Sequence, residues 1–181
     1  RYLASVGGFV FNSRTTGRSV AELLQADTRP APALPPPDLI AYPAADHLPV
    51  PGPAAVQRLI DARRAAAGPT EILFVGNLIP RKGLHHLLAA LARLPGESWR
   101  LHAVGSADVD PTYAARLSAE IGRLGLGDRV LLHGRLSDSG LVAHLRQAHL
   151  LAVPSYEGFG IVYLEAMAFG LPVIASTAGA A

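Results

Sequence analysis

The feature that most constrains the fold is an alternation, repeated after residue 70, between short aliphatic runs and longer segments with helical spacing. The short runs have the length and residue types of buried strands. Strands that alternate with helices are typical of βα repeats, in which the strands form a parallel sheet. We therefore predict an α/β fold, with strands near Ile72–Val75, Arg100–Val104, Arg129–Leu132, Leu150–Val153 and Pro172–Ala175.

Three helices are predicted between these strands, because apolar residues recur there at intervals of three and four. Their apolar faces are Leu84, Leu87, Leu88 and Leu91, then Tyr113, Leu117, Ile121 and Leu124, and finally Leu141, Leu145 and Ala148. Small residues follow several predicted strands, at Gly76, Gly105 and Gly134. These positions lie at the carboxyl edge of the sheet, where open α/β sheets bind their ligands.

The first 53 residues differ in character from the rest. Residues 28–53 contain the stretches PAPALPPP and PVPGP, which cannot continue a helix and favour extended backbone. We interpret this segment as a linker. In front of it, GGFVFNS predicts a strand, and a helix is predicted from about Thr15 to Gln25. We expect residues 1–27 to be the end of a preceding domain, and residues 54–181 to be a second domain that is incomplete at its C-terminus.

Composition excludes several classes of protein. Half of the 181 residues are apolar, so we expect a folded core. The net charge of +2 is not gathered into basic tracts, which makes nucleic acid a poor candidate partner. The chain has no cysteine, which excludes disulfides, thiolate nucleophiles and zinc sites built on sulfur. No run approaches the roughly 18 apolar residues of a membrane span, and no signal-peptide pattern is present, so we expect a soluble protein in the cytoplasm.

Sequence motifs exclude further classes. The chain has no P-loop, no G-x-G-x-x-G fingerprint and no G-x-S-x-G elbow. The nucleoside triphosphatase, dehydrogenase and α/β-hydrolase interpretations therefore lose their main support. The histidines are scattered and no pair has the i, i+4 spacing of a metalloprotease, so we expect most to be structural or exposed. They are His47, His85, His86, His102, His133, His144 and His149.

The segment VGNLIPRKGLHHLL, residues 75–88, is the first candidate site. A strand ends at Gly76, the loop carries Arg81 and Lys82, and a helix follows. Two cations and free backbone N–H groups at a helix N-terminus suit an anion, above all a phosphate. The alternative is a solvated basic pair at the start of a helix.

The segment ADVDP, residues 107–111, is a second candidate. Asp108 and Asp110 have the Asp-x-Asp spacing that can hold magnesium or manganese against a diphosphate. However, Asp110 directly precedes Pro111, and an N-cap aspartate followed by proline at the first helical position explains the pattern fully. We favour the cap.

The segment PSYEGFGIVYLEAMAFGLPV, residues 154–173, contains two acids that need an explanation. Glu157 stands beside Gly158 and Gly160, which let the backbone approach a ligand closely where a helix starts. Glu165 is expected about two turns into that helix, inside an apolar run where an unpaired carboxylate is costly. Two acids around exposed N–H groups suit a ligand with hydroxyls on both sides of a phosphate. The alternative for Glu165 is a core ion pair with an arginine.

These residues resemble a known family. The run EGFGIVYLEAMAFGLPVIAS resembles the E-x7-E motif of retaining GT-B glycosyltransferases, a group that includes bacterial mannosyl- and glucosyltransferases and sucrose synthases. VGNLIPRKGL resembles the phosphate-binding loop of the same group, and HGRL lies between the two motifs, where that family packs the nucleobase. The resemblance covers residues 71–178. It implies that the chain is the Rossmann-like donor-binding domain of a GT-B fold, with a short remnant of the preceding domain.

The resemblance also implies roles for individual residues. Lys82 and Glu157 would be catalytic, Lys82 against the donor diphosphate and Glu157 against the sugar hydroxyls, while Glu165 would hold the ribose. The donor would be a UDP- or GDP-sugar, bound without a metal ion or other cofactor. The full set of predicted donor-binding residues is Gly76, Asn77, Arg81, Lys82, Gly105, Arg135, Leu136, Glu157, Gly158, Phe159, Gly160, Ile161 and Glu165.

The chain departs from the family at Asn77, where an arginine is usual. One diphosphate contact is then weakened, or Arg81 supplies it. We expect the full-length protein to be a hexosyltransferase that acts on a carbohydrate or lipid-linked acceptor, with peripheral contact at the inner face of the membrane if the acceptor is a lipid. The fragment alone is expected to be inactive. A noncatalytic sugar-nucleotide-binding module and a nucleotide-sugar epimerase of similar fold remain alternatives.

Overall fold

The computed structural model describes residues 9–26, 39–42 and 47–177. Two structural units divide the chain, and each is described by itself. The first comprises Arg1–Ala44, Glu157–Ile161 and Thr177–Ala181, and the second comprises Ala45–Tyr156 and Val162–Ser176. The predicted boundaries at residues 27 and 53 remain a prediction.

The first unit contains the predicted strand and helix. β1 (Val10–Phe11) is followed by α1 (Arg14–Ala26), and the side chain of Phe11 packs against Gly17 of this helix. β1 pairs in parallel with β2 (Leu39–Ile40), which lies inside the segment predicted to be a linker. That segment therefore does more than connect two parts of the chain. The stretch PAPALPPP lies outside the described residues.

The second unit is built on a parallel sheet of five strands with the order β5-β4-β3-β6-β7. All five predicted strands are present, with ends shifted by at most two residues. They are β3 (Thr70–Val75), β4 (Trp99–Val104), β5 (Val130–Gly134), β6 (Leu150–Val153) and β7 (Val173–Ala175). The central strands are buried on both faces, as continuous aliphatic runs require: Leu73, Phe74, Leu101, Leu151 and Val153 have no measurable exposure.

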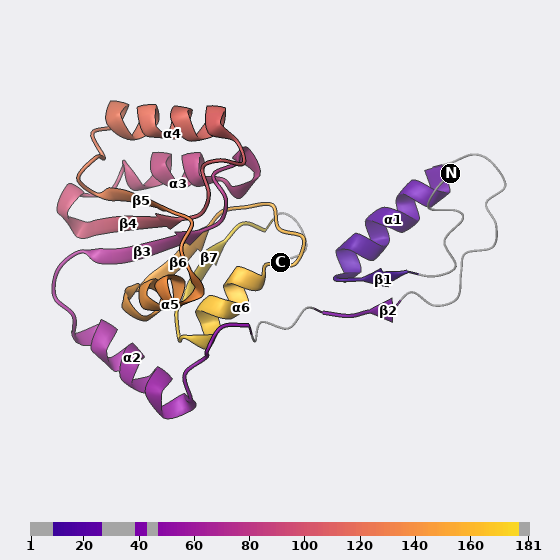
Figure 1. The fold of residues 1–181 in the computed structure, drawn as a ribbon, viewed down its shortest axis with the longest axis horizontal. Helices are drawn as coiled ribbons and strands as arrows, with labels where there is room; N and C mark the ends of the chain where they lie inside the picture. The colour runs from indigo at the N-terminus through magenta and orange to yellow at the C-terminus, as the bar shows by residue number, and fades with distance from the viewer. Residues whose placement is uncertain (1–8, 27–38, 43–46, 178–181) are drawn as a thin grey trace. The chain divides into compact units, whose positions relative to one another are not determined.

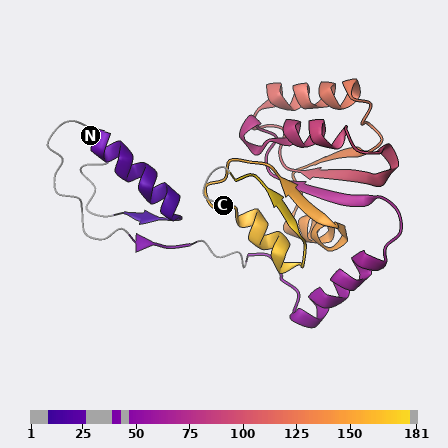
Figure 2. The same cartoon turned by 180° about the vertical axis from the view of Figure 1, so that it is seen from behind.

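Helices cover both faces of this sheet. Figure 1 shows α3 (Leu84–Leu91) and α4 (Pro111–Arg123) together on one face, and Figure 2 shows the same layer from behind. On the other face lie α5 (Asp138–Gln147) and α6 (Ile161–Ala168). None of the helices in the described ranges is both long and apolar enough to cross a bilayer.

One helix, α2 (Pro53–Ala65), was not predicted. It begins with Pro53 after Gly52, at the point where the proline-rich segment ends. The apolar residues of α2 do not form a strong helical pattern in the sequence, which is why it was missed. No residue of the helix is fully buried, and Val56, Leu59 and Ile60 are half-buried. The guanidinium of Arg63 anchors it, since Nη1 donates to the carbonyl oxygen of Phe169 (2.9 Å) and Nη2 to that of Leu145 (2.8 Å).

Candidate functional site

The strand order places a topological switch point between β3 and β6. From β3 the chain builds β4 and β5 on one side, and it then crosses over to build β6 and β7 on the other. Loops that follow neighbouring strands at such a point diverge and leave a crevice at the carboxyl edge, where ligands of open α/β sheets bind. The loops after β3 and β6 carry the two motifs singled out in the sequence.

The loops after β3 and β6 are joined to each other. The guanidinium of Arg81 donates to the carbonyl oxygen of Tyr156 (2.6 Å), and the amide of Tyr156 donates to the carbonyl oxygen of Arg81 (3.2 Å). Arg81 is exposed, but part of its donor capacity is used in holding the two loops together. Its predicted contact with a diphosphate remains a prediction.

Lys82 lies over the glycine that ends β3. It is the last residue of a short 3-10 helix, Pro80–Lys82, and its side chain runs back over Gly76, where the site of a missing Cβ is 3.0 Å from the Lys82 Cδ atom. Gly105, after β4, approaches the same point, because a Cβ there would lie 2.0 Å from the Gly76 carbonyl oxygen. The structure thus brings together three predicted site residues, Gly76, Lys82 and Gly105. Asn77 lies beside them and is exposed.

The loop after β5 continues the same edge. The amide of Gly105 donates to the carbonyl oxygen of Gly134 (2.8 Å), which ties the end of β4 to the residue before Arg135. Arg135 is exposed, and Leu136 is half-buried against Gly140. Both are therefore placed at the carboxyl edge, as the sequence predicts, and their contact with a base remains a prediction.

Glu157–Ile161 belongs to the first structural unit. Glu157 is 8% exposed, Gly158 is exposed, and Gly160 has a φ of 83°, a conformation that favours glycine directly before α6 begins at Ile161. The ring of Phe159 stacks on that of Tyr42 at 5.8 Å between centroids. The predicted roles of these residues toward a ligand remain predictions.

Glu165 is buried, with 6% exposure, and it lies about one turn into α6 rather than two. Its carboxylate lies 2.6 Å from Nε2 of His47, so the partner is a histidine and not the arginine considered from the sequence. Burial raises the pKa of Glu165, His47 opposes this shift, and Asp138 adds to it. Sequence reasoning missed His47 because it lies in the proline-rich segment, far from the motif.

Asp110 has the role that was favoured from the sequence. Its side chain accepts from the amide of Tyr113 (2.9 Å), with Pro111 at the start of α4, so it is an N-cap. Asp108 accepts from the hydroxyl of Ser106 (3.1 Å) within the preceding turn.

A buried hydroxyl network supports the turn after β6 and was missed in the sequence. The hydroxyl of Tyr163 donates to the carbonyl oxygen of Val153 (3.0 Å) and lies 3.2 Å from the Ser155 hydroxyl. The hydroxyl of Ser176 donates to the carbonyl oxygen of Ser155 (2.9 Å). These bonds join the end of β6 to α6 and to the residue after β7, and thereby hold the loop at the switch point.

Three histidines that are far apart in the sequence lie together in the structure. His102, His133 and His144 form a group in which one ring nitrogen from each lies within 4.8 Å of the others. Spacing along the sequence could not reveal this group, because its members come from β4, β5 and α5.

Comparisons with known proteins match most of the chain to one family. The family model described as glycosyl transferases group 1 matches residues 56–181, which is more than half of the chain. A D-inositol 3-phosphate glycosyltransferase of Mycolicibacterium smegmatis is 42% identical over 126 residues, covering 66% of this chain. A protein of the same description from Nocardia farcinica is 34% identical over 187 residues and covers 98% of this chain.

Among solved structures, Anabaena Alr3699/HepE in complex with UDP and glucose superposes with a TM-score of 0.72 and 29% identity, covering 97% of this chain and 45% of that one. The matched regions are 28% of the length of the M. smegmatis relative and 39% of the N. farcinica relative. The chain therefore spans well under half of each relative.

Proposed function

Because the chain belongs to the glycosyl transferases group 1 family, we propose that it supplies the donor site of a retaining glycosyltransferase that transfers a hexose from a nucleotide diphosphate sugar. The observation that carries this proposal is the junction of the two motif loops at the switch point of the sheet. There Lys82 lies over Gly76, and Arg81 is bonded to Tyr156.

The junction suits a diphosphate for electrostatic reasons. As the glycosidic bond of the donor breaks, negative charge develops on the leaving diphosphate. Lys82 would stabilise that charge together with backbone N–H groups, and a preorganised donor of this kind is usually a large part of catalysis. Arg81 directly precedes Lys82 in the loop and would add to the positive field while keeping its hydrogen bond to Tyr156. We propose that no metal ion takes part in this step.

The remaining roles follow from the chemistry of the donor. Glu157 would orient the sugar hydroxyls, and the N–H groups of Phe159, Gly160 and Ile161 would serve the sugar and phosphate. Glu165 would accept from the ribose hydroxyls, because a carboxylate can accept two parallel hydrogen bonds. Arg135 and Leu136, in the loop after β5, would border the base.

The Anabaena protein was solved in complex with UDP and glucose, which supports a UDP-linked hexose as the first donor to test. Both bacterial relatives are described as D-inositol 3-phosphate glycosyltransferases, which supports a polyol phosphate as an acceptor to test. We propose that the full-length protein acts in the cytoplasm on a carbohydrate or lipid-linked acceptor.

Calorimetric titration of the full-length protein with UDP and GDP tests the donor site. We expect one of the two nucleotides to bind and Lys82→Ala to weaken that binding. The control Arg116→Ala, at an exposed arginine of α4, should leave binding unchanged. Binding of neither nucleotide would overturn the proposal. Binding without transfer or donor hydrolysis would instead identify a noncatalytic module, and the anomeric configuration of a transferred sugar decides whether the reaction is retaining.

A further inference from the structure

The histidine group lies on the face of the sheet that α5 covers, with His144 contributed by α5 itself. Nδ1 of His102 lies 2.9 Å from Nε2 of His133, and the ring of His144 lies 5.2 Å and 4.4 Å from the rings of His102 and His133. Three imidazoles with nitrogens this close together have the ligand type of a transition-metal site.

Sheet geometry explains why two of these residues meet. His102 is in register with Leu73 of β3 and Leu131 of β5, so its side chain is on the face opposite to that of its neighbours Leu101 and Ala103. His133 is two residues after Leu131 and therefore shares this face. The pairing of β4 with β5 shifts register between Ala103 and Val104, opposite His133, and such irregularities commonly re-aim a side chain.

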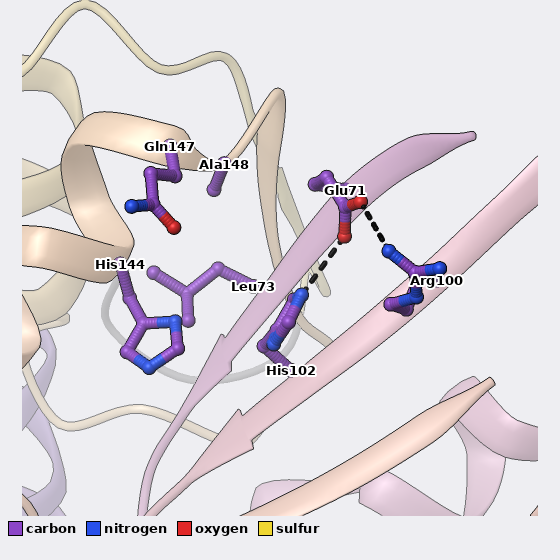
Figure 3. A pocket seen from close by; sticks show the side chains of 7 residues that line it. All are labelled: Glu71, Leu73, Arg100, His102, His144, Gln147 and Ala148. Carbon is purple, nitrogen blue, oxygen red and sulfur yellow. Dashed lines mark hydrogen bonds and ion pairs between the residues drawn. The ribbon is translucent and has the colours of Figure 1, made fainter. Parts of the chain in front are cut away.

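A carboxylate orients the first ring of the group. Nε2 of His102 is hydrogen-bonded to Glu71 (2.8 Å), and Arg100 donates to the other oxygen of the same carboxylate (2.9 Å), as Figure 3 shows. With Nε2 carrying the proton toward Glu71, Nδ1 accepts a hydrogen bond from Nε2 of His133, whose proton a metal ion would displace. A carboxylate that orients a histidine in this way is the usual outer partner of a metal-bound imidazole.

A cavity of about 200 Å³ adjoins the group, lined by Glu71, Leu73, Arg100, His102, His144, Gln147 and Ala148. Figure 3 shows His144 and Gln147 on one side of it and Glu71 with Arg100 on the other. The cavity has room for a water molecule, which is the common fourth ligand beside three histidines.

We propose that His102, His133 and His144 bind one divalent transition-metal ion, with Zn²⁺ as the reference case, and that Glu71 is the positioning residue for His102. Zinc–nitrogen bonds of about 2.0–2.1 Å in a tetrahedron place the nitrogens about 3.4 Å apart. One pair of nitrogens lies 2.9 Å apart and one nitrogen of each histidine lies within 4.8 Å of the others, so these distances bracket the tetrahedral separation.

The ion would join β4, β5 and α5, and would close the segment between His133 and His144. That segment holds Arg135 and Leu136, so the ion would fix the loop proposed to border the nucleobase. Because the unfolded chain lacks this arrangement, binding would also raise the thermal midpoint with increasing ion concentration.

Titration of the metal-free, full-length protein with Co²⁺ and Zn²⁺ tests the proposal. We expect one Co²⁺ per chain with the visible absorption of a low-coordinate site, displacement by Zn²⁺, and a higher thermal midpoint with either ion. His133→Ala and His144→Gln should lose the absorption and the thermal shift. His86→Ala, an exposed histidine outside the group, should keep both. Circular dichroism establishes that each variant is folded.

Glu71→Gln separates a metal site from a merely structural cluster. It should weaken binding about 10- to 100-fold, the usual effect of losing an outer carboxylate, without changing the stoichiometry. Two results would overturn the proposal: no saturable binding by the wild-type protein, or equal binding by the His133→Ala and His144→Gln variants.

Discussion

The α-carbon of Gly83 lies directly against the carbonyl oxygen of Pro154, at the place where the loops after β3 and β6 meet. A Cβ at residue 83 would be 2.3 Å from that oxygen, and the φ of Gly83 is 74°. Gly83→Ala therefore adds backbone strain of about 1–2 kcal/mol and a clash with main-chain atoms. We expect the free energy of unfolding, measured with urea, to fall by at least about 2 kcal/mol.

Gly122 provides the matched control. It is the second-last residue of α4, is exposed, and has no atom within 4 Å of the position that a Cβ would take. Gly122→Ala should not lower the free energy of unfolding and should raise it by at most about 1 kcal/mol, because alanine loses less backbone entropy in a helix. Equal effects at the two glycines would show that the junction at Pro154 is looser than described.

Removing the cation over Gly76 tests the electrostatic part of the proposed mechanism. Lys82→Ala in the full-length protein should lower kcat by an amount equivalent to roughly 2.7–4 kcal/mol of barrier, the range found when one preorganised donor is lost. Steady-state kinetics with a saturating sugar donor measure it, with Arg93→Ala as a control on the loop after α3. Near-normal turnover in the Lys82 variant would remove this residue from the mechanism.

Substitution of Arg63 is expected to reduce stability strongly, although α2 has no fully buried residue. Arg63→Ala would leave the carbonyl oxygens of Phe169 and Leu145 without their charged donor, and hydrogen bonds to charged groups are worth about 1.5–3 kcal/mol. We expect a loss of that order in chemical denaturation. The control is Arg64→Ala, at the exposed neighbouring residue, which should change the free energy of unfolding by less than about 0.5 kcal/mol. Arg63→Lys should recover only part of the loss, because lysine lacks the planar fork.

The raised pKa of Glu165 predicts how stability depends on pH. Burial makes the folded protein bind a proton at Glu165 more tightly than the unfolded chain does. The resulting contribution to the free energy of unfolding is fully present below the ordinary pKa of 4.5. It is lost as the pH rises through the folded pKa. Glu165→Gln removes the titration, so the variant should gain stability relative to wild type across that window.

Urea unfolding at a series of pH values measures this difference for Glu165→Gln, with the exposed Glu97→Gln as the control. A difference between the Glu165 variant and wild type that stays flat, or that falls with increasing pH, would mean that His47 outweighs burial at this carboxylate.

The parts of the structure that could be predicted are those determined by local pattern and by strand direction. The strands follow from aliphatic runs. The position of Gly76, Gly105 and Gly134 at the carboxyl edge follows from the fact that parallel strands end at one edge. The Asp110 cap needs only its own three neighbours.

Other parts depend on where distant segments come to lie. The pair His47 and Glu165 requires the path of the proline-rich segment, which no periodicity describes. The histidine group requires the order of the strands, the face on which His102 lies and the position of α5 at the same time. None of these three follows from a local pattern in the sequence.

The strand order also bears on how the chain reaches its folded state. β3 pairs with β4 over a short stretch of chain, but Ile72 of β3 pairs with Leu150 of β6 only after two strands and three helices have intervened. Pairing across a longer loop costs more entropy and forms later. We therefore expect β3, β4 and β5 to assemble first and the crevice between β3 and β6 to be among the last features to form. Slow steps in refolding should then report directly on the appearance of nucleotide binding.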